Sequence, residues 1–473
     1  MSSGERKLLI TSGGGDLESP DLSINQPGVS DPAAPTNSFF GATFIVINAS
    51  IGAGLLSFPY AFLQAGVIPA IFIQLGFVVF IGAALLILAY CAERTHAMNY
   101  QQVVEKCCGT TLGVICQVCV VIYCFGACVT FFVVIGDQLD SMLRFAAGTL
   151  DHWYLDRRFT TSVVSIVVAI LSFFRNISYL SKPSSAGVFA MVYLVIVVVV
   201  RYGTKTYPPL ETPIHFEHSW SVAFGAIPVI CFGFQCHVSA VPVYHALSGR
   251  SVRRFAGVVA LAMGLNTTLY TLAGAFGAMS FGDGTCSDIL VNYTPTDKAI
   301  TAARVALAFN IVTSYPILHY CGRAAFFDLY VRIRSLPPVA DELAPEPPAE
   351  RVRRYVASSI WLVTSLLIAI NVSDVKKVIE PFGGLAACFI FAFPGLCLFN
   401  VAFDLTGISA RRRQMTIATG VLFLLIGMFI FGENLTLVAM RDSGAIGSGP
   451  PCASLKSNPI SPSHHHADNY TWA

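Results

Sequence analysis

Charged residues are scarce in this sequence, and that scarcity sets its class. Asp, Glu, Lys and Arg make up 12% of the 473 residues, against about 25% in a typical soluble domain. Hydrophobic residues reach 55%, and the mean hydropathy is +0.66. This balance is typical of a chain that lies mostly within a lipid bilayer. The net charge of +2 argues against nucleic acid as a partner, because such proteins carry a strongly basic surface.

Other features are missing as well. The first 38 residues are polar and rich in Gly, Ser and Pro, so no cleavable signal peptide is visible. No membrane segment carries a cluster of acids and histidines suited to hydrolytic or redox chemistry, so we do not expect an enzyme. Of the 14 cysteines, only Cys286 and Cys452 fall on the side that we assign to the exterior. At most one disulfide therefore links them, which excludes a disulfide scaffold.

Long apolar runs dominate what is present, and we count eleven that are suited to helices crossing a bilayer. A further short helix, Tyr100–Cys108, is predicted at the membrane surface. The eleven segments are Phe39–Phe62, Val67–Ala92, Leu112–Gly136, Phe159–Phe174, Ala186–Tyr202, Trp220–His245, Phe255–Met279, Ala299–Cys321, Val356–Asn371, Val378–Val401 and Ile417–Phe431.

The basic residues orient these spans. Short loops such as 250–254 and 411–413 are rich in Arg, which places them and the N-terminus in the cytosol. The sequence thus predicts a disordered cytosolic tail (residues 1–37), a transmembrane domain (residues 38–432) and a disordered tail outside the cytosol (residues 433–473). Asn292, in an Asn-Tyr-Thr sequence, is then the best-placed glycosylation site.

The first span is unusual for an anchor. Its middle carries Asn48, Ser50, Gly52 and Gly54, where polar side chains and glycines weaken a helix. Broken backbone at membrane depth is tolerated only where it faces protein or a wet cavity, and there it can bind ions and solutes. The alternative is a close-packing face, since glycine also lets helices approach one another.

The sixth span repeats this anomaly five helices later. Pro228, Gly233 and Gln235 interrupt an otherwise apolar run. This spacing is expected when helices 1–5 and 6–10 form inverted repeats that each open with a discontinuous helix. The two breaks then meet near the midplane around a small cavity. His237, in the same span, fits either a role in substrate or proton binding or a hydrogen bond to a neighbouring carbonyl.

The cavity chemistry favours a neutral amino acid. Unwound backbone offers amides to a carboxylate and carbonyls to an ammonium group, and almost no formal charge faces the site. In the eighth span, Thr313 and Ser314 could supply hard oxygen ligands to sodium. The alternative for this pair is hydrogen bonding to carbonyls one turn earlier in their own helix.

Four motifs carry a family resemblance: FIVINASIGAGLLSFPYAF, ICFGFQCHVSAVPVY, IVTSYPILHYCGRA and FGGLAACFIFAFPGLCLF. They resemble the sodium-coupled neutral amino acid transporters of the amino acid/auxin permease family, nearest the branch that exports glutamine and asparagine from lysosomes. The resemblance implies an all-α membrane protein of eleven transmembrane helices, with a five-plus-five inverted repeat and discontinuous helices 1 and 6. It also implies that Asn48 handles sodium and substrate, and that Thr313 or Ser314 is a sodium ligand.

Together these arguments predict a site. The substrate-binding residues are predicted to be Asn48, Ile51, Gly52, Ala53, Gly54, Leu55, Tyr123, Phe232, Gly233, Phe234, Gln235 and Cys388. The sodium ligands are predicted to be Asn48, Ile51, Thr313 and Ser314. The expected function is sodium-coupled transport of glutamine or asparagine from lysosome to cytosol. The alternatives are a plasma-membrane or proton-coupled transporter, and an amino-acid-sensing receptor that does not transport.

The N-terminal tail predicts the location. Glu5, Leu9 and Ile10 fit a dileucine signal, in which an acidic residue precedes two apolar ones that cytosolic sorting adaptors bind. We expect the Leu9→Ala, Ile10→Ala double variant to move from lysosomes to the cell surface, as followed by microscopy of the tagged chain. A variant that stays in lysosomes, or a wild-type chain already at the surface, would contradict the signal.

Overall fold

Apolar segments of this length fold as helices because a helix satisfies its own backbone hydrogen bonds, which lipid cannot do. The computed structural model describes residues 37–147, 153–174, 177–207, 224–294, 296–334, 347–372, 382–404 and 409–443. All of them belong to one unit, Pro35–Ala473. Within these ranges the regular structure is helical, apart from one isolated bridge between Asn37 and Leu247.

Each predicted span corresponds to a helix or to a pair of short helices. The spans are α1 (Phe39–Ser50) with α2 (Gly54–Ala65), α3 (Val67–Thr95), α5 (Thr110–Ala147), α6 (Arg157–Ser172), α7 (Ser181–Gly203), α9 (Ala226–Gly233) with α10 (His237–His245), α11 (Val252–Phe281), α12 (Lys298–Ile333), α13 (Pro348–Asn371), Phe382–Phe403, which includes α15 (Phe393–Asp404), and α16 (Ala410–Asp442). The surface helix is confirmed as α4 (Tyr100–Cys108).

In length and composition, ten of these spans suit a membrane crossing, if the bent pair α1 and α2 is one of them. The eleventh, α6, has 16 residues. It extends about 24 Å, less than the roughly 30 Å of a hydrocarbon core.

The C-terminal boundary differs from the prediction. We expected the membrane domain to end at residue 432, but α16 continues to Asp442. The added turns have a structural reason. The side chain of Asn434 is buried, and its Oδ1 accepts a hydrogen bond from the backbone N–H of Gly384 at 3.2 Å. This bond fixes the last part of α16 against the start of the span Phe382–Phe403.

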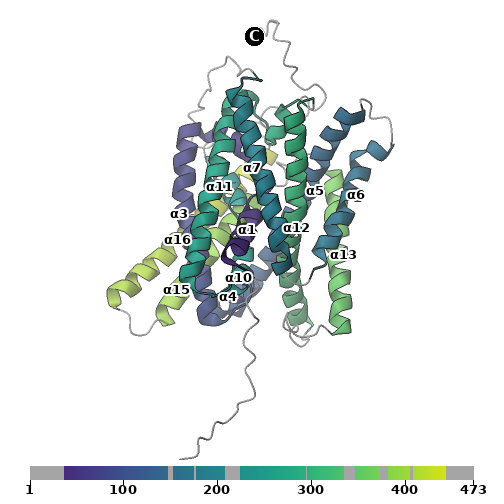
Figure 1. Cartoon of the computed structure of the whole chain (residues 1–473). Coiled ribbons are helices and arrows are strands. Elements are labelled where there is room, and N and C mark those ends of the chain that lie inside the picture. The colour runs from purple at the N-terminus through teal and green to yellow at the C-terminus, as the bar shows by residue number, and fades with distance from the viewer. Residues whose placement is uncertain are drawn as a thin grey trace, which may run out of the picture. The chain divides into compact units, whose positions relative to one another are not determined.

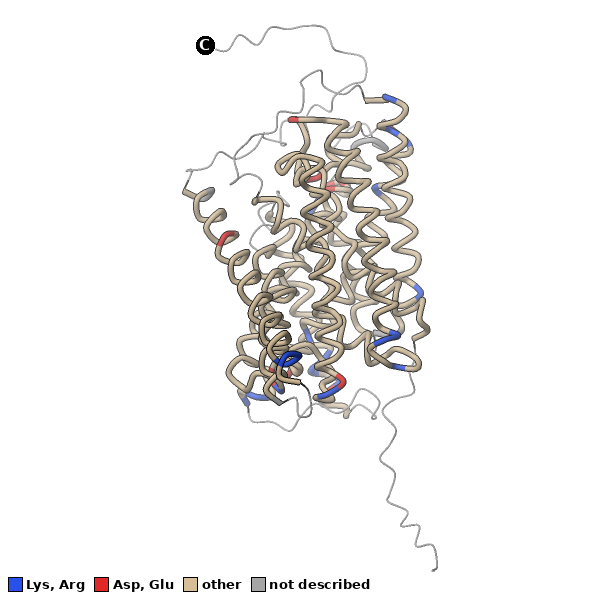
Figure 2. Tube along the Cα trace, turned by 90° about the vertical axis from the view of Figure 1, so that its left-hand side faces the viewer, with Lys and Arg blue, Asp and Glu red and all other residues tan. Residues whose placement is uncertain are grey.

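The broken helices lie inside the bundle. Figure 1 shows α1 and α10 in the middle, with α7, α11 and α12 beside them, and the span Ala226–His245 is buried throughout. Spans such as α3 and α16 are mostly exposed on the outside of the bundle, as lipid-facing helices are. Lys and Arg gather mainly at the lower end of the molecule, beside α4 and the start of α16 (Figure 2). The distribution of basic residues in membrane proteins predicts that this end faces the cytosol.

The two breaks touch. α1 and α2 are bent by 59° at residues 51–53, and α9 ends at Gly233 before α10 begins at His237. A Cβ atom added at Gly54 would lie 2.8 Å from the Cα atom of Gly233. Only glycine permits this approach of the two backbones. The predicted meeting of the breaks in the two halves is therefore confirmed.

A buried arginine fastens the loop between α11 and α12. Arg304 of α12 donates from Nη1 to Gln138 Oε1 at 3.1 Å and from Nη2 to the carbonyl of Leu290 at 2.6 Å. Gln138 Nε2 in turn donates to Asp288 Oδ2 at 2.9 Å. Because the arginine, the glutamine and the aspartate are all buried, these hydrogen bonds hold the loop against α5 and α12 away from solvent.

The contact of the breaks is testable through Gly54→Ala. The added methyl group must displace the backbone at Gly233, so we expect a loss of stability of about 1–3 kcal/mol, as for overpacked cores. Thermal unfolding of the purified protein in detergent measures it. Gly264→Ala is the control, since its Cβ meets nothing within 4 Å. Equal unfolding temperatures for the two variants would contradict the close contact.

Candidate functional site

The break in the first span frees backbone groups. Leu55 N–H donates to Gly52 O at 3.1 Å, three residues back, and so leaves the carbonyl of Ile51 without its helical partner. At the start of α2, Leu56 N–H likewise donates to Ala53 O at 3.2 Å, whereas the N–H of Gly54 has no carbonyl of a preceding turn as its partner. Such a helix start attracts an anion, and the free carbonyls at the end of α1 attract a cation. The break can therefore serve both ends of a zwitterion.

One side chain of α11 bridges the two breaks. The hydroxyl of Tyr270 lies 2.8 Å from the carbonyl oxygen of Ser50 and 2.7 Å from that of Gly233. Its ring stacks on Phe58 with centroids 4.0 Å apart. One turn earlier, Asn266 Nδ2 donates to Ser50 Oγ. Neither residue was predicted from the sequence, although polar side chains at positions i and i+4 of an apolar helix are the signal of a shared polar face.

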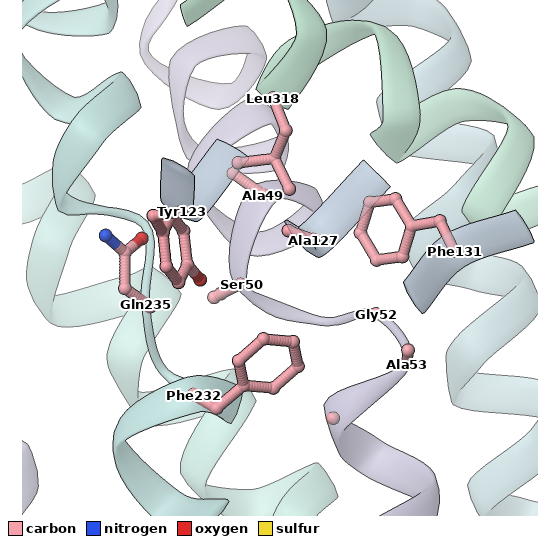
Figure 3. Close-up of a pocket in the computed structure, with 11 residues that line it drawn as sticks. Ala49, Ser50, Gly52, Ala53, Tyr123, Ala127, Phe131, Phe232, Gln235 and Leu318 are labelled. Atoms are coloured by element: carbon pink, nitrogen blue, oxygen red, sulfur yellow. The ribbon is translucent and has the colours of Figure 1, made fainter. Parts of the chain in front are cut away.

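A cavity opens beside the break in α1 and α2 (Figure 3). The aromatic rings of Tyr123, Phe131 and Phe232 lie around it, with Gln235 next to Tyr123. The cavity is small. Its volume, counted for the centre of a water-sized sphere, is about 20 Å³, so it can hold roughly one water molecule. Its lining residues are Ala49, Ser50, Gly52, Ala53, Gly54, Tyr123, Ala127, Phe131, Phe232, Gln235 and Leu318. None of these side chains is an acid, a lysine, an arginine or a histidine.

The amide of Gln235 is the exceptional polar group in this cavity. The residue is 2% exposed, and neither Nε2 nor Oε1 has a hydrogen-bond partner. An unpaired buried amide destabilises a protein by about 1–3 kcal/mol per group. Native proteins rarely leave such groups unpaired except at functional positions. Gln235 thus brings an unpaired donor group, Nε2, and an unpaired acceptor, Oε1, to the lining of the cavity.

A second polar cluster lies where α1, α7 and α12 meet. Ser314 Oγ is 3.0 Å from the carbonyl oxygens of both Asn48 and Asn310, and Thr313 Oγ1 is 2.8 Å from that of Asn310. Both hydroxyls therefore form the hydrogen bonds to their own helix that the sequence left as the alternative. Ser314 also reaches across to α1. Hydroxyl and carbonyl oxygens converge here from two helices, which is the donor set that sodium prefers.

Side chains from α7 and α12 complete this cluster. Asn310 Nδ2 donates to Asn48 Oδ1 at 2.8 Å, and Asn48 Nδ2 lies 3.4 Å from Ser184 Oγ. A Cβ at Gly187 of α7 would lie 2.6 Å from Asn48 Oδ1 and 2.7 Å from Thr313 Oγ1. Ser184, Gly187 and Asn310 were not predicted. Asn310 could have been found, since it stands one helical turn before Thr313 and Ser314.

The predicted substrate residues differ in whether they line the cavity. Those lining the cavity are Gly52, Ala53, Gly54, Tyr123, Phe232 and Gln235, whereas Asn48 belongs to the polar cluster and Ile51 to the break. Besides Asn48 and Ile51, the predicted residues that do not line it are Leu55, Gly233, Phe234 and Cys388. The lining residues that were not predicted are Ala49, Ser50, Ala127, Phe131 and Leu318.

Packing explains the residues that lie elsewhere. Leu55 is in the apolar core, Gly233 packs on Gly54, and Phe234 packs on Tyr270 with centroids 4.8 Å apart. Cys388 begins a π-helical turn, Cys388–Ala392, which adds a residue that a period of 3.6 does not foresee. The following residue, Phe389, packs on Tyr123 instead, with ring centroids 5.4 Å apart.

Other predicted groups have definite surroundings. His237 Nε2 lies 3.3 Å from the carbonyl oxygen of Ile81. This is the hydrogen bond to a neighbouring carbonyl that was one of the two interpretations of this residue. Asn292 is buried, and its Nδ2 donates to Gly284 O at 2.7 Å, so a glycan on that atom would have to replace this bond. Its glycosylation stays a prediction.

Cys286 forms a disulfide, and the other twelve cysteines within the described ranges are thiols. Glu5, Leu9, Ile10 and Cys452 lie outside the described residues. Among the residues that are described, no three or more His, Cys, Asp or Glu side chains are grouped so as to hold a metal ion.

Comparison with known proteins identifies the family of this chain. The family model described as "Transmembrane amino acid transporter protein" matches residues 35–435. "Sodium-coupled neutral amino acid transporter 7" of Danio rerio is 38% identical over 90% of this chain and 92% of its own length. The human protein of that name is 38% identical over 91% and 94%, respectively. Mouse "Solute carrier family 38 member 8" is 37% identical over 87% and 96%.

A solved structure supports the fold. MhsT in complex with L-phenylalanine superposes with a TM-score of 0.54, covering 84% of this chain and 98% of its own, at 15% identity. This likeness confirms the predicted fold class, an all-α membrane protein built on inverted repeats with discontinuous first and sixth helices.

Tyr270→Phe tests the bridge between the breaks. The variant keeps the ring that stacks on Phe58 but leaves the carbonyls of Ser50 and Gly233 without its hydroxyl. We expect a loss of about 1–3 kcal/mol, read as a lower unfolding temperature. Thr268→Val is the matched control, because Thr268 is exposed on the same helix and bonds only to its own turn. A Tyr270→Phe protein as stable as this control would argue against the bridge.

Proposed function

The chain belongs to the transmembrane amino acid transporter family, and from that premise we propose that it couples sodium entry to the transport of glutamine and asparagine from the lysosomal lumen to the cytosol. The relatives are named as transporters, so the chain is not an enzyme. Their names also specify sodium coupling and neutral amino acids, which is the coarser part of the proposal. The amide substrates and the lysosomal location are the finer part.

The unpaired amide of Gln235 is the observation that carries the choice of substrate. A carboxamide has one donor face and one acceptor face, so a second carboxamide can satisfy both atoms in a paired arrangement. The side chains of glutamine and asparagine end in that group. An aliphatic substrate would leave Gln235 unsatisfied, and a charged one would enter a cavity whose lining has no ionic partner.

The amino acid head group and the ion are assigned to the break. The N–H groups at the start of α2 face the substrate carboxylate, and the carbonyl oxygens at the end of α1 remain for the ammonium group. Sodium, as the co-transported ion, is placed among Asn48 O, Ile51 O, Asn310 O, Thr313 Oγ1 and Ser314 Oγ. Since Asn48 lies in the last turn of α1 and Ile51 in the break that follows it, sodium binding would order the backbone that binds the substrate. This shared segment is a physical route to coupling.

Transport also requires movement. The cavity has room for about one water molecule, so a bound amino acid needs Phe232 and the neighbouring rings to shift. Alternating access in this fold proceeds by rocking one group of helices against the other around the central site. The breaks at residues 51–53 and 234–236 are the natural hinges. The lysosomal location follows from the resemblance and from the dileucine pattern at Glu5, Leu9 and Ile10.

Purified protein in liposomes tests the proposal. Counterflow of labelled glutamine that depends on a sodium gradient supports a sodium-coupled transporter. Counterflow that follows a pH gradient alone would support proton coupling instead, and binding without counterflow would support a receptor.

The sodium site is tested by a Thr313→Ala, Ser314→Ala double variant. Each lost ligand to a charged group costs about 1.5–3 kcal/mol, so the sodium concentration for half-maximal uptake should rise at least about tenfold. Thr268→Ala controls for loss of a hydroxyl that bonds only within its own helix. Unchanged sodium dependence in a folded double variant would remove this site.

Selectivity is tested by Gln235→Leu. The variant keeps the volume but loses the amide, so kcat/KM for glutamine should fall by about tenfold or more relative to that for alanine. The partly exposed Gln64, at the end of α2, supplies a control as Gln64→Leu. Competition by lysine or aspartate equal to that by glutamine, in the wild-type chain, would contradict the neutral cavity.

A further inference from the structure

A cluster of thiols lies away from the transport site, at the end of the molecule where basic residues gather. Cys108 is the last residue of the surface helix α4, and Cys397 lies on α15. Their Sγ atoms are 3.9 Å apart. Cys107 is hydrogen-bonded to both Cys91 of α3 and Cys397. Three helices thus bring four thiols together, in a compartment where disulfides are normally kept reduced.

Cys108 and Cys397 differ in the way that an oxidant-sensing pair requires. Cys108 is half-buried and therefore reachable from outside, whereas Cys397 is fully buried. Asn400 Nδ2 donates to Cys108 Sγ at 3.4 Å. The pKa of the Cys108 thiol is lowered, chiefly by its hydrogen bond with Cys397 and also by that with Asn400, against the effect of burial. A reactive thiol beside a buried partner is the usual pattern of redox sensors.

This pair of thiols is connected to the substrate cavity through a chain of residue contacts. α4 packs on α15, and the hydroxyl of Tyr100 donates to the carbonyl oxygen of Phe389 at 3.0 Å, inside the π-helical turn. Phe389 contacts Tyr123, which lines the cavity. A covalent link between α4 and α15 would therefore hold the tenth span at two points, next to a residue that contacts the site.

We propose that hydrogen peroxide joins Cys108 and Cys397 in a reversible disulfide that ties α4 to α15 and slows transport. The Cys108 thiolate attacks one peroxide oxygen, which breaks the O–O bond and leaves a sulfenic acid and hydroxide; the hydroxide takes up the proton that the thiol released. The sulfur of Cys397 then attacks the sulfenic sulfur, and water leaves. In sum, two thiols lose two electrons and two protons, and one peroxide becomes two waters.

The geometry requires little movement. A disulfide has an S–S distance of about 2.05 Å, so the two sulfurs must approach by about 1.9 Å. Cys108 is followed by Gly109, whose φ of +89° ends α4 before α5 begins at Thr110. Glycine at this joint gives the end of α4 the freedom to make that shift. Cytosolic thiols restore the dithiol by exchange.

The experiment uses the full chain in liposomes, treated with hydrogen peroxide and then digested for mass spectrometry. We expect a Cys108–Cys397 crosslink, a loss of glutamine uptake through a lower maximal rate, and recovery of both with dithiothreitol. Cys108→Ser should transport normally and no longer respond to peroxide. Cys119→Ser, another half-buried thiol on the adjacent α5, should respond as the wild type does.

Two readouts keep the outcomes apart, because the effect on uptake rests on the proposed function whereas the crosslink does not. A Cys107–Cys397 crosslink, or none, overturns the assignment of the pair. A complete Cys108–Cys397 crosslink with unchanged uptake overturns its effect on transport. Should the wild-type chain transport no amino acid before oxidation, the proposed function fails while the crosslink still decides the thiol chemistry.

Discussion

The structure depends on the direct contact between two interruptions of helical backbone within a membrane-spanning bundle. In lipid, each N–H or C=O group that a break releases must be satisfied by protein or by a bound solute. Here Gly54 and Gly233 let the broken segments touch, and the hydroxyl of Tyr270 reaches a carbonyl oxygen on each. The remaining groups face a small neutral cavity. Because the breaks share partners, a change at one must alter the hydrogen bonds of the other.

The polar cluster beside this contact has a related role. Hydrogen bonds link Asn48, Asn310, Thr313 and Ser314 across α1 and α12, while Gly187 lets α7 approach. A cation that entered would replace weak hydrogen bonds between neutral groups with stronger bonds to charge. It would also fix the last turn of α1, which ends where the substrate head group is placed. In the proposed function, ion and solute thus act on the same few residues.

The regions around the core restrain it from both ends. On one side, the buried network of Arg304, Gln138 and Asp288 holds the loop between α11 and α12. On the other, α4 is bonded to the π-helical turn of the tenth span through Tyr100. The tenth span is therefore attached to Asn434 of α16 near its start, at Gly384, and to the surface helix α4 five residues later, at Phe389. Its movement during transport has to be accommodated at those attachments.

Much of this was readable from residue order, for physical reasons. Apolar length predicts spans because lipid requires helices, and glycine and polar residues in corresponding places of the two halves predict the breaks and their meeting. Thr313 and Ser314 were singled out as adjacent hydroxyls in the eighth span, and their role as sodium ligands stays a prediction. Tyr270, Phe131 and Ser184 could not be assigned in this way, since their importance comes from helices that are distant in the chain. Cys388 was misplaced because a π-helical turn changes the register, and the true end of α16 depended on a hydrogen bond between Asn434 and Gly384. Local composition thus predicts which helices break, whereas the packing of distant helices determines which side chains surround the break.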